Sequence, residues 1–385
     1  MTVVAAMPGK AERDVSAGKR RFLYIQPGTA SFAGIERVVD TVCTELAEQY
    51  GSEFEVDVLY TSIHKNYPTE PRKYNAIREL AKHRLKLMAV YRDIISRNRY
   101  DVVVVPQVEP TVTCWLSCLG LGQKLIMHIH GNPDVERRNF KSGIMFFVMK
   151  HVVLRRLSSI FGTSPRQLDS FNALYPSAVP RVWVPNPVRR FDDGPERASE
   201  SGAGAARPVT YVNVGRFSDQ KGQDILIDAF AKLHKERPDT RLKLVGHGVN
   251  EPALRAQIDR LGLADVATIE HHPTNPQAAL AASDIYVSTS RWEGWSLVIC
   301  EALRFGLPVI ATDCDFGPSD ILTDRRLGTL VPASAEEALV EAMKYYYDNL
   351  ASEKEFSEYR KEAVDVYSAE RVVHVHAEAL KRAAG

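Results

Sequence analysis

Two glutamates near the start of an apolar segment are the residues of this sequence best placed for chemistry. Glu293 and Glu301 lie in STSRWEGWSLVICEAL (288–303). A strand-like run ends there, and the pattern predicts a helix from Gly294 to Phe305. The free amides at the start of such a helix bind anions. They belong to Gly294, Trp295, Ser296 and Leu297.

The spacing of the two glutamates indicates a ligand with polar groups at both ends. Eight helical residues correspond to roughly 12 Å. This length suits a nucleotide sugar, with Glu293 at the sugar, the amides at the pyrophosphate and Glu301 at the ribose. The alternative is a loop acid followed by a solvated helix acid. Because Glu301 is flanked by apolar residues and an unpaired buried carboxylate is costly, we favour function.

A second candidate site follows another strand-like run, in VNVGRFSDQKGQDILIDAF (212–230). Gly215 ends the strand, and Arg216 and Lys221 share the loop after it. Two cations placed there can neutralise charge on a departing diphosphate without a metal ion. A solvated basic loop would explain the pair if it stood alone. Its place beside Glu293, at a matching strand end, favours the catalytic interpretation.

Short apolar runs that alternate with amphipathic segments predict how these residues are positioned. Uninterrupted apolar strands separated by helices indicate parallel sheets covered on both faces. The sequence therefore predicts an α/β protein with two Rossmann-like, doubly wound domains that face a central cleft. The expected strands are 21–26, 55–61, 101–107, 124–130, 158–164, 181–188, 209–215, 241–248, 266–272, 284–290 and 307–313.

Composition breaks give the expected domain boundaries. Residues 1–20 resemble a flexible tail, and a Pro/Gly/Ala/Ser-rich stretch marks a linker at 191–208. The first domain is predicted at 21–190 and the second at 209–365. A closing helix at 366–385 is expected to hold the two domains together.

Charge and cysteine content limit the environment of the chain. The net charge is +1 over 385 residues, but residues 1–190 carry +10 and residues 191–385 carry −9. This asymmetry indicates that the first half faces something anionic. Five scattered cysteines without a CxxC pair favour buried thiols in a reducing compartment. With no signal peptide or membrane-spanning run apparent, we expect a cytoplasmic location, including the inner face of the cytoplasmic membrane.

The ordered motifs resemble a known family. G-R-F-x-x-x-K-G, followed about 75 residues later by E-G-x₆-E, is similar to the retaining GT-B glycosyltransferases of family 4. The similarity also includes VPNPV (184–188) and ALRFGLPVIATDCDFGPSDIL (302–322). It implies that Arg216 and Lys221 bind the donor diphosphate, that Glu293 holds the donor sugar and that Glu301 binds the ribose.

The resemblance also assigns residues outside these two loops. His130 in MHIHGNP (127–133) matches a family histidine near the reacting centre. The amino-terminal glycine loop of the family usually has two glycines, and here only Gly34 remains, because Ala33 replaces the other. Gly246 in VGHGVN (245–250) is expected near the nucleotide base.

Metal and cofactor motifs are weak. Asp313-Cys314-Asp315 resembles a DxD metal motif but falls where family 4 has a donor-side loop, so we interpret it as structural. His128 and His130 lack a carboxylate or thiolate partner, which makes a poor metal site; His128 is expected in the core. No P-loop is present. We expect neither a metal nor a cofactor, and no nucleic-acid partner.

The resulting hypothesis is a metal-independent, retaining transfer of a hexose or N-acetylhexosamine from a UDP- or GDP-sugar. The acceptor would be a glycan or polyprenyl-linked glycan in bacterial surface polysaccharide biosynthesis, because CDFGPSDI resembles a loop of such enzymes, with Asp320 in place of the usual Glu. Two alternatives stay open: a nucleotide-sugar 2-epimerase and a non-enzymatic nucleotide-sugar-binding protein.

One segment of the first half could bind a membrane. Residues 136–157 combine cations with apolar bulk, including Phe146 and Phe147. Such a segment can lie at an anionic membrane surface. The alternative is a helix that covers the first sheet with both phenylalanines turned inward.

Overall fold

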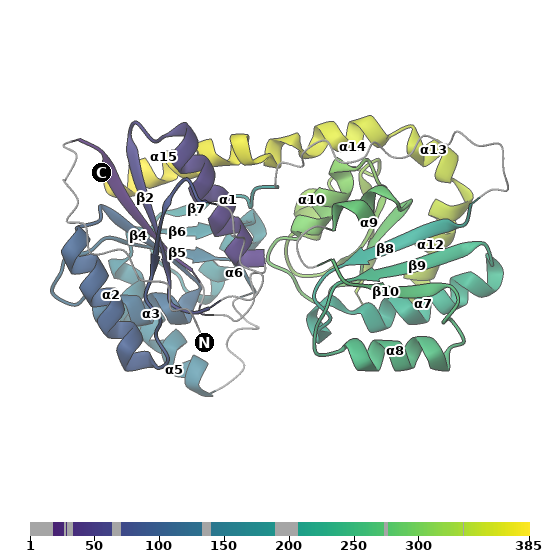
Figure 1. Cartoon of the computed structure of the whole chain (residues 1–385), viewed down its shortest axis with the longest axis horizontal. Helices are drawn as coiled ribbons and strands as arrows, with labels where there is room; N and C mark the ends of the chain where they lie inside the picture. The colour runs from purple at the N-terminus through teal and green to yellow at the C-terminus, as the bar shows by residue number, and fades with distance from the viewer. Residues whose placement is uncertain are drawn as a thin grey trace, which may run out of the picture.

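The computed structural model describes residues 18–26, 28, 34–63, 71–132, 140–188, 207–272, 276–333 and 335–385, without the side chains of 140–142. Two parallel sheets, each flanked by helices, form two domains side by side (Figure 1). The predicted α/β class with two Rossmann-like domains is confirmed.

The first sheet has seven strands in the order β3-β2-β1-β4-β5-β6-β7. Their bounds are β1 Arg20–Ile25, β2 Phe54–Tyr60, β3 Asn75–Arg78, β4 Val102–Pro106, β5 Leu125–Ile129, β6 Ser159–Gly162 and β7 Arg181–Trp183. All neighbouring strands are parallel, and the order reverses beside β1. Side chains that follow the carboxyl ends of these strands therefore gather at one edge of the sheet, where ligands of such folds bind.

The second sheet has six parallel strands in the order β10-β9-β8-β11-β12-β13. Their bounds are β8 Val209–Val214, β9 Thr240–Val245, β10 Ala267–Glu270, β11 Ile285–Ser288, β12 Val309–Asp313 and β13 Gly328–Pro332. The expected strands match these elements within a few residues, but β3 and β13 were not predicted. Both are short strands at sheet edges, where weaker apolar patterning gives little signal.

Helices cover the sheets and turn their apolar sides inward. In the first domain they are α1 Gly34–Gln49, α2 Arg84–Asn98, α3 Val108–Ser117, α5 Phe140–Val148, the π-helix η1 Met149–Val153, the short 3-10 turn η2 Leu154–Arg156 and α6 Pro165–Leu174. In the second they are η3 Asp219–Lys221, α7 Gln223–Glu236, α8 Glu251–Arg260, α9 Gln277–Ala281, α10 Leu297–Arg304, α11 Pro318–Ile321, α12 Glu336–Asp348, α13 Leu350–Lys354, α14 Ser357–Val364 and η4 Asp365–Tyr367. The last helix is α15 Ala369–Ala384.

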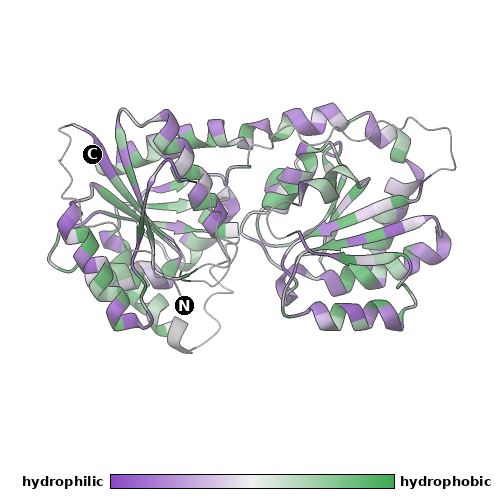
Figure 2. Cartoon of the chain, viewed as in Figure 1, coloured by the Kyte–Doolittle hydropathy of each residue, from purple (hydrophilic) through white to green (hydrophobic). Residues whose placement is uncertain are grey.

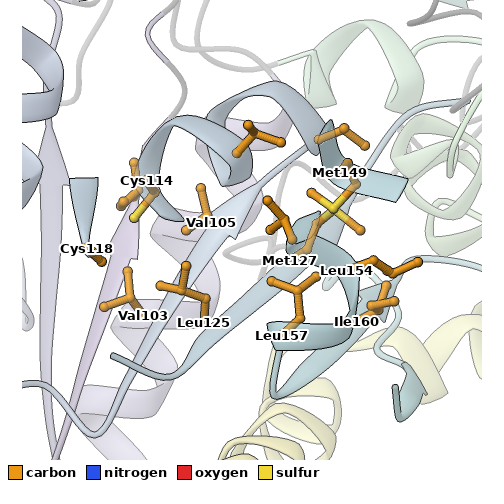
Figure 3. Close-up of a cluster of buried hydrophobic side chains, with 14 of the residues drawn as sticks. Val103, Val105, Cys114, Cys118, Leu125, Met127, Met149, Leu154, Leu157 and Ile160 are labelled. Carbon is orange, nitrogen blue, oxygen red and sulfur yellow. The ribbon is translucent and has the colours of Figure 1, made fainter. Parts of the chain in front are cut away.

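Buried apolar side chains from strands and helices make the core. Figure 2 shows the strands of the first sheet largely hydrophobic, whereas the helices alternate between hydrophobic and hydrophilic stripes. All five residues of β4 are buried, as expected for a strand covered on both faces. Figure 3 shows one cluster in which β4 and β5 side chains meet α3, η1 and η2. The cysteines of the chain are all buried and free, which confirms the expectation of buried thiols.

The end of the chain returns to the first domain. Helices α13 and α14 lie on the second domain, and α15 continues across to pack on α1 (Figure 1). Val373, Ala377 and Leu380 of α15 are buried in a core cluster with strands of the first sheet. At the crossing, Val188 donates its amide to the Tyr367 carbonyl at 2.7 Å. The chain therefore passes from one domain to the other after Val188 and returns after Tyr367. Loops of the two domains also contact each other.

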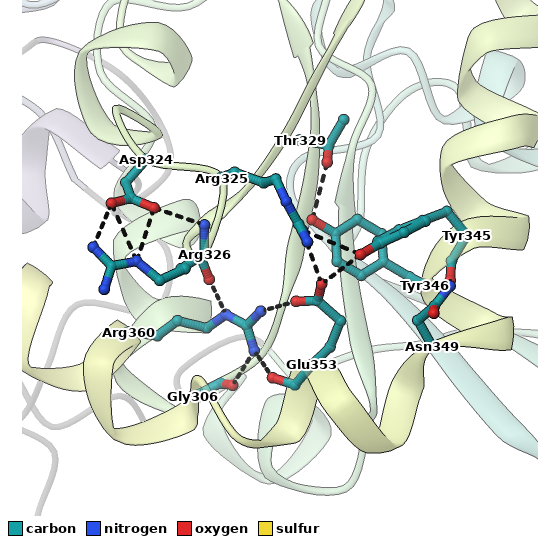
Figure 4. Close-up of polar contacts among 10 residues, drawn as sticks. All are labelled: Gly306, Asp324, Arg325, Arg326, Thr329, Tyr345, Tyr346, Asn349, Glu353 and Arg360. Carbon is teal, nitrogen blue, oxygen red and sulfur yellow. Dashed lines mark hydrogen bonds and ion pairs between the residues drawn. The ribbon is translucent and has the colours of Figure 1, made fainter.

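A buried ion pair fixes the helices that precede this crossing. Arg360 of α14 is fully buried and pairs with Glu353 of α13, which is 1% exposed (Figure 4). The Arg360 guanidinium also donates to the Arg326 carbonyl at 2.7 Å and the Glu353 carbonyl at 2.6 Å. These bonds attach α13 and α14 to the segment leading into β13.

Candidate active site

An ion pair between two loops lies at the centre of the candidate site. Lys221 Nζ is 2.5 Å from Glu293 Oε1, and the Ser290 hydroxyl donates to the same oxygen at 2.6 Å. Glu293 is only 4% exposed. The loop after β8 and the loop after β11, which the sequence singled out separately, therefore meet.

The backbone holds Lys221 in this position. The η3 turn ends at Gly222, whose φ of 61° is left-handed, and α7 begins directly after it. A Cβ on Gly222 would lie 2.2 Å from the Thr289 carbonyl oxygen, so the two loops pack too closely for any other residue. The Thr289 hydroxyl donates to the Gly222 carbonyl at 2.8 Å. Arg291 adds a bidentate pair to Asp224, at 2.6 and 3.0 Å.

Gly215 lies against the Lys221 side chain, and Arg216 follows it on the same loop. Gly246, after β9, approaches Gly215 so closely that a Cβ on it would lie 1.9 Å from the Gly215 carbonyl oxygen. Gln223 supports the loop by donating to the Arg216 carbonyl at 3.2 Å. The Arg216 side chain is exposed, which leaves its guanidinium accessible to an anionic ligand.

The helix expected from Gly294 begins later. α10 starts at Leu297, with Ser296 as its N-cap, and ends before Phe305. Gly294 and Trp295 are therefore loop residues, and only Ser296 and Leu297 of the four predicted amides lie at the helix start. The helical geometry assumed for the whole segment between the two glutamates therefore holds only from Leu297 onward.

Both glutamates nevertheless lie close to one buried hydroxyl. Glu301 lies on α10 and is 5% exposed, so the prediction of a buried acid is confirmed. Burial raises the pKa of Tyr286, and the charges of Glu293 and Glu301 raise it further. Both carboxylates therefore act electrostatically on the same buried tyrosine.

The loop that carries Glu293 touches the first domain. A Cβ on Gly294 would lie 1.9 Å from the His130 carbonyl oxygen, so glycine is required at this contact. The Thr163 hydroxyl, after β6, donates to the Gly294 carbonyl at 3.2 Å. The strand ends of the two sheets thus face and contact each other, with His130 and Glu293 on opposite sides of the contact.

His130 is a buried imidazole next to the domain contact. Its ring lies 3.9 Å from the His128 ring, and neither of its ring nitrogens has a hydrogen-bond partner among the residues that the structure describes. Burial lowers the pKa of His130 to about 3, with a further contribution from His376. With this pKa the imidazole is neutral at neutral pH, with one N–H donor and one nitrogen acceptor. His128 is buried at 2% exposure, as predicted for a core residue.

The amino-terminal glycine loop is only partly defined. Gly34 is the first residue of α1 and is exposed, with open space where a side chain would project. Phe32 and Ala33 lie outside the described residues. The backbone carbonyl of Glu36 accepts from Gln26 at 3.1 Å, which fixes the start of α1 against the end of β1.

The two aspartates of the DxD-like sequence make contacts between domains. The Asn132 side-chain amide donates to Asp315 Oδ2 at 2.6 Å, and Asp313 Oδ1 lies 4.0 Å from Arg166 Nη1. In the described part of the chain, no three His, Cys, Asp or Glu side chains gather as a metal site. Sequence reasoning missed Asn132, although it lies only three residues after the strand that carries His128.

Comparison with known proteins supports the assignment of both halves. The profile "Glycosyltransferase Family 4" matches residues 32–190, and "Glycosyl transferases group 1" matches residues 197–363. The amylovoran biosynthesis glycosyltransferase AmsD of Erwinia amylovora is 31% identical over 312 residues, which are 79% of this chain and 84% of AmsD. The lipopolysaccharide core mannosyltransferase LpsB of Rhizobium meliloti is 32% identical over 208 residues, 51% of this chain and 57% of LpsB.

Solved structures share the fold at lower identity. Anabaena HepE, determined with UDP and glucose, superposes with a TM-score of 0.78 at 18% identity, over 94% of this chain and 99% of HepE. Several curated relatives match over shorter stretches, of which the chain covers 28% to 57% of their length. The matches to both halves, and the match along most of AmsD, show that this chain belongs to glycosyltransferase family 4 and has its two-domain GT-B fold.

Proposed function

We propose that this protein transfers a sugar from a UDP-sugar to a glycan, with retention of anomeric configuration and without a metal ion. The observation that carries the proposal is the Lys221–Glu293 pair, which the two loops hold opposite His130. The solved relative HepE contains UDP and glucose, which favours uridine over guanosine in the donor. A hexose or N-acetylhexosamine is the proposed sugar.

In this mechanism the chain stabilises the departing diphosphate. Arg216 and Lys221 lie on one loop, so both cations can approach the same phosphates, and the amides of Ser296 and Leu297 add donors at the start of α10. Lys221 would exchange part of its contact with Glu293 for the phosphate. Glu293 then accepts from hydroxyls of the donor sugar, and Glu301 accepts from the ribose.

The product keeps the anomeric configuration of the donor if the acceptor hydroxyl attacks the anomeric carbon from the same face from which the diphosphate leaves. Neutral His130 lies across the domain contact from Glu293 and is proposed to orient the sugar. The leaving phosphate is the proposed acceptor of the proton from the attacking hydroxyl. No enzyme carboxylate is assigned as a covalent nucleophile.

Three measurements test this function. UDP, GDP and ADP are compared in thermal-shift assays, because a ligand that binds the native state raises its apparent stability. Radiolabelled UDP-glucose and UDP-N-acetylglucosamine are then offered with lipid and glycan extracts, and the anomeric configuration of the product is read by NMR. We expect stabilisation by UDP, a product with the donor's configuration and full activity in EDTA. An inverted product would reject retention, and activity lost in EDTA and restored by Mg²⁺ or Mn²⁺ would reject metal independence.

We also propose that the acceptor is lipid-linked and is met at an anionic membrane surface. Helix α5 and η1 expose Phe147 at 64%, Ile144 at 45% and Val152 at 42%. The same segment carries the exposed cations Lys150, Arg155 and Arg156, and the described side chains of 143–157 include no carboxylate. This combination of apolar and cationic side chains fits an anionic lipid interface.

The start of α2 extends this surface. Arg84 contacts Met145 at 2.8 Å, which places α2 beside α5. Its neighbour Leu85 is 77% exposed, between the exposed cations Arg84 and Lys86. Phe146, in contrast, is 1% exposed and belongs to the core, so only one of the two phenylalanines is at the surface. No helix in the described parts of the chain has the length and apolarity needed to cross a bilayer.

A further inference from the structure

The segment after β12 contacts both the candidate site and the first domain. Cys314 is buried beside the ion pair, where burial and the Glu293 charge raise the pKa of its thiol to about 12 and the Lys221 charge opposes them. The next side chain, Asp315, is exposed and accepts from Asn132 of the first domain at 2.6 Å. Cys314 and Asp315 are therefore neighbours in sequence, but Cys314 lies on the side of the candidate site and Asp315 on the side of the first domain.

Hydrogen bonds connect this segment to Glu293. The Thr312 hydroxyl, in β12, donates to the Ser290 carbonyl at 2.6 Å. The Ser290 hydroxyl in turn donates to Glu293 at 2.6 Å. The position of Asp315 is thus tied to the loop that carries the catalytic candidate.

The other end of the contact is equally well fixed. Asn132 is 4% exposed and lies two residues after His130. The Gly131 carbonyl between them accepts from Gln167 at 2.7 Å, and the His130 amide donates to Gln107 at 3.2 Å. A bond from Asn132 to Asp315 therefore holds the His130 segment at a set position against the Glu293 loop.

A second bond nearby supports the same closure. Ser164, the N-cap of α6, donates to Asp320 at 2.7 Å, and the same Asp320 oxygen accepts from the Gly317 amide at 3.1 Å. The aspartate that replaces the glutamate expected in this motif is thus used at the domain contact. Both bonds join the first domain to the 313–320 segment.

We infer that Asp315 is a positioning residue, which closes the two domains through Asn132 and so brings His130 against the Glu293 loop. The DxD-like sequence thereby has a role in closure. The expected effect on catalysis rests on the proposed function, whereas the expected effect on domain closure does not. Because Asp315 is exposed, its replacement leaves the core intact.

A side-chain exchange tests this inference. Asn132→Asp places two carboxylates in contact, and Asp315→Asn in the same chain restores a donor and an acceptor with their positions reversed. We expect Asn132→Asp to lower kcat about tenfold, the approximate value of one hydrogen bond to a charged group, and the double variant to recover most of it. Asp315→Ala should lose about as much, whereas Asp313→Asn should stay within about twofold of the wild type.

Small-angle X-ray scattering of the ligand-free proteins separates closure from catalysis. The wild type and the double variant should give the smaller radius of gyration, and Asn132→Asp and Asp315→Ala the larger one. UDP should still raise the melting temperature of Asp315→Ala, because this residue does not bind the donor. Equal radii for all variants, a double variant no better than Asn132→Asp, or loss of the UDP effect would overturn the inference. If no sugar transfer is found, the scattering result still decides whether Asp315 closes the domains.

Discussion

Lys221 and Arg216 should act mainly on the chemical step. Charge on the leaving diphosphate is larger in the transition state than in the bound donor, so their cations contribute most there. We expect Lys221→Ala and Arg216→Ala each to lower kcat about 100-fold, which corresponds to roughly 3 kcal/mol. Steady-state kinetics with saturating donor measure this. Lys232→Ala, which removes an exposed lysine paired with Glu336, is the control. An unchanged kcat in both cation variants would contradict the assigned role.

Glu301 should instead affect donor binding. A ribose contact has similar strength in the ground and transition states, so its loss raises KM and leaves kcat nearly unchanged. We expect Glu301→Ala to raise the donor KM about tenfold, as for one lost hydrogen bond to a charged group. Glu337→Ala, at a side chain that is 86% exposed, is the matched control. A large fall in kcat with an unchanged KM would place Glu301 in the reaction itself.

At the scale of elements, the buried pair in Figure 4 determines how α13 and α14 are attached. Replacing Arg360 removes the buried cation that pairs with Glu353 and leaves this carboxylate only the exposed Arg325 as a cationic partner among the described residues. We expect Arg360→Met to lower the free energy of unfolding by about 3–5 kcal/mol, measured by urea denaturation. Arg325→Met removes a partner of the same Glu353 whose side chain is 66% exposed, and it should cost less than about 1 kcal/mol. Similar losses in both variants would show that burial does not set the energy of this pair.

The docking of α15 should weaken in acid. Burial lowers the pKa of His376, on α15, to about 4, and that of His130 to about 3. Between pH 6.5 and about 4 the unfolded chain binds protons that the folded chain excludes, so stability falls as the pH falls. Each histidine contributes roughly 1.4 kcal/mol per pH unit in this window.

Urea midpoints at several pH values test this dependence. His376→Leu should reduce the slope of unfolding free energy against pH by the contribution of one histidine, roughly 1.4 kcal/mol per pH unit. Val375→Leu, at an exposed position on the same helix that carries no titratable group, should leave the slope unchanged. Identical slopes in the wild type and His376→Leu would show that this histidine does not contribute.

At the scale of the whole molecule, the exposed apolar surface of α5 and η1 predicts membrane binding. The protein should co-sediment with phosphatidylglycerol vesicles at low salt and be released as salt screens the cations. Ile144→Ser with Phe147→Ser should abolish most of this binding without unfolding the protein, because both side chains are exposed. Val375→Ser, at an exposed valine of α15, is the control. Failure of the wild type to bind anionic vesicles at low salt would favour a soluble acceptor.

The sequence was sufficient to predict most of the fold. Apolar runs such as Val102–Pro106 are buried on both faces, so their composition alone indicates parallel strands. The edge strands β3 and β13 were missed, because an edge strand needs less apolar character. The start of α10 was placed three residues early, since nothing local distinguishes the loop at Gly294 from a first helical turn.

By itself, the sequence identified Arg216, Lys221, Glu293 and Glu301 as candidates for binding a phosphorylated ligand, and the resemblance to family 4 added His130. Only the tertiary structure placed Lys221 on Glu293 and Gly294 against His130, contacts between residues 72 or more positions apart. It also placed Phe146 in the core and Phe147 at the surface, although the two are neighbours in one apolar run. Such outcomes depend on how two sheets pack and on which side of a helix meets the core, and no local pattern of residue types contains that geometry.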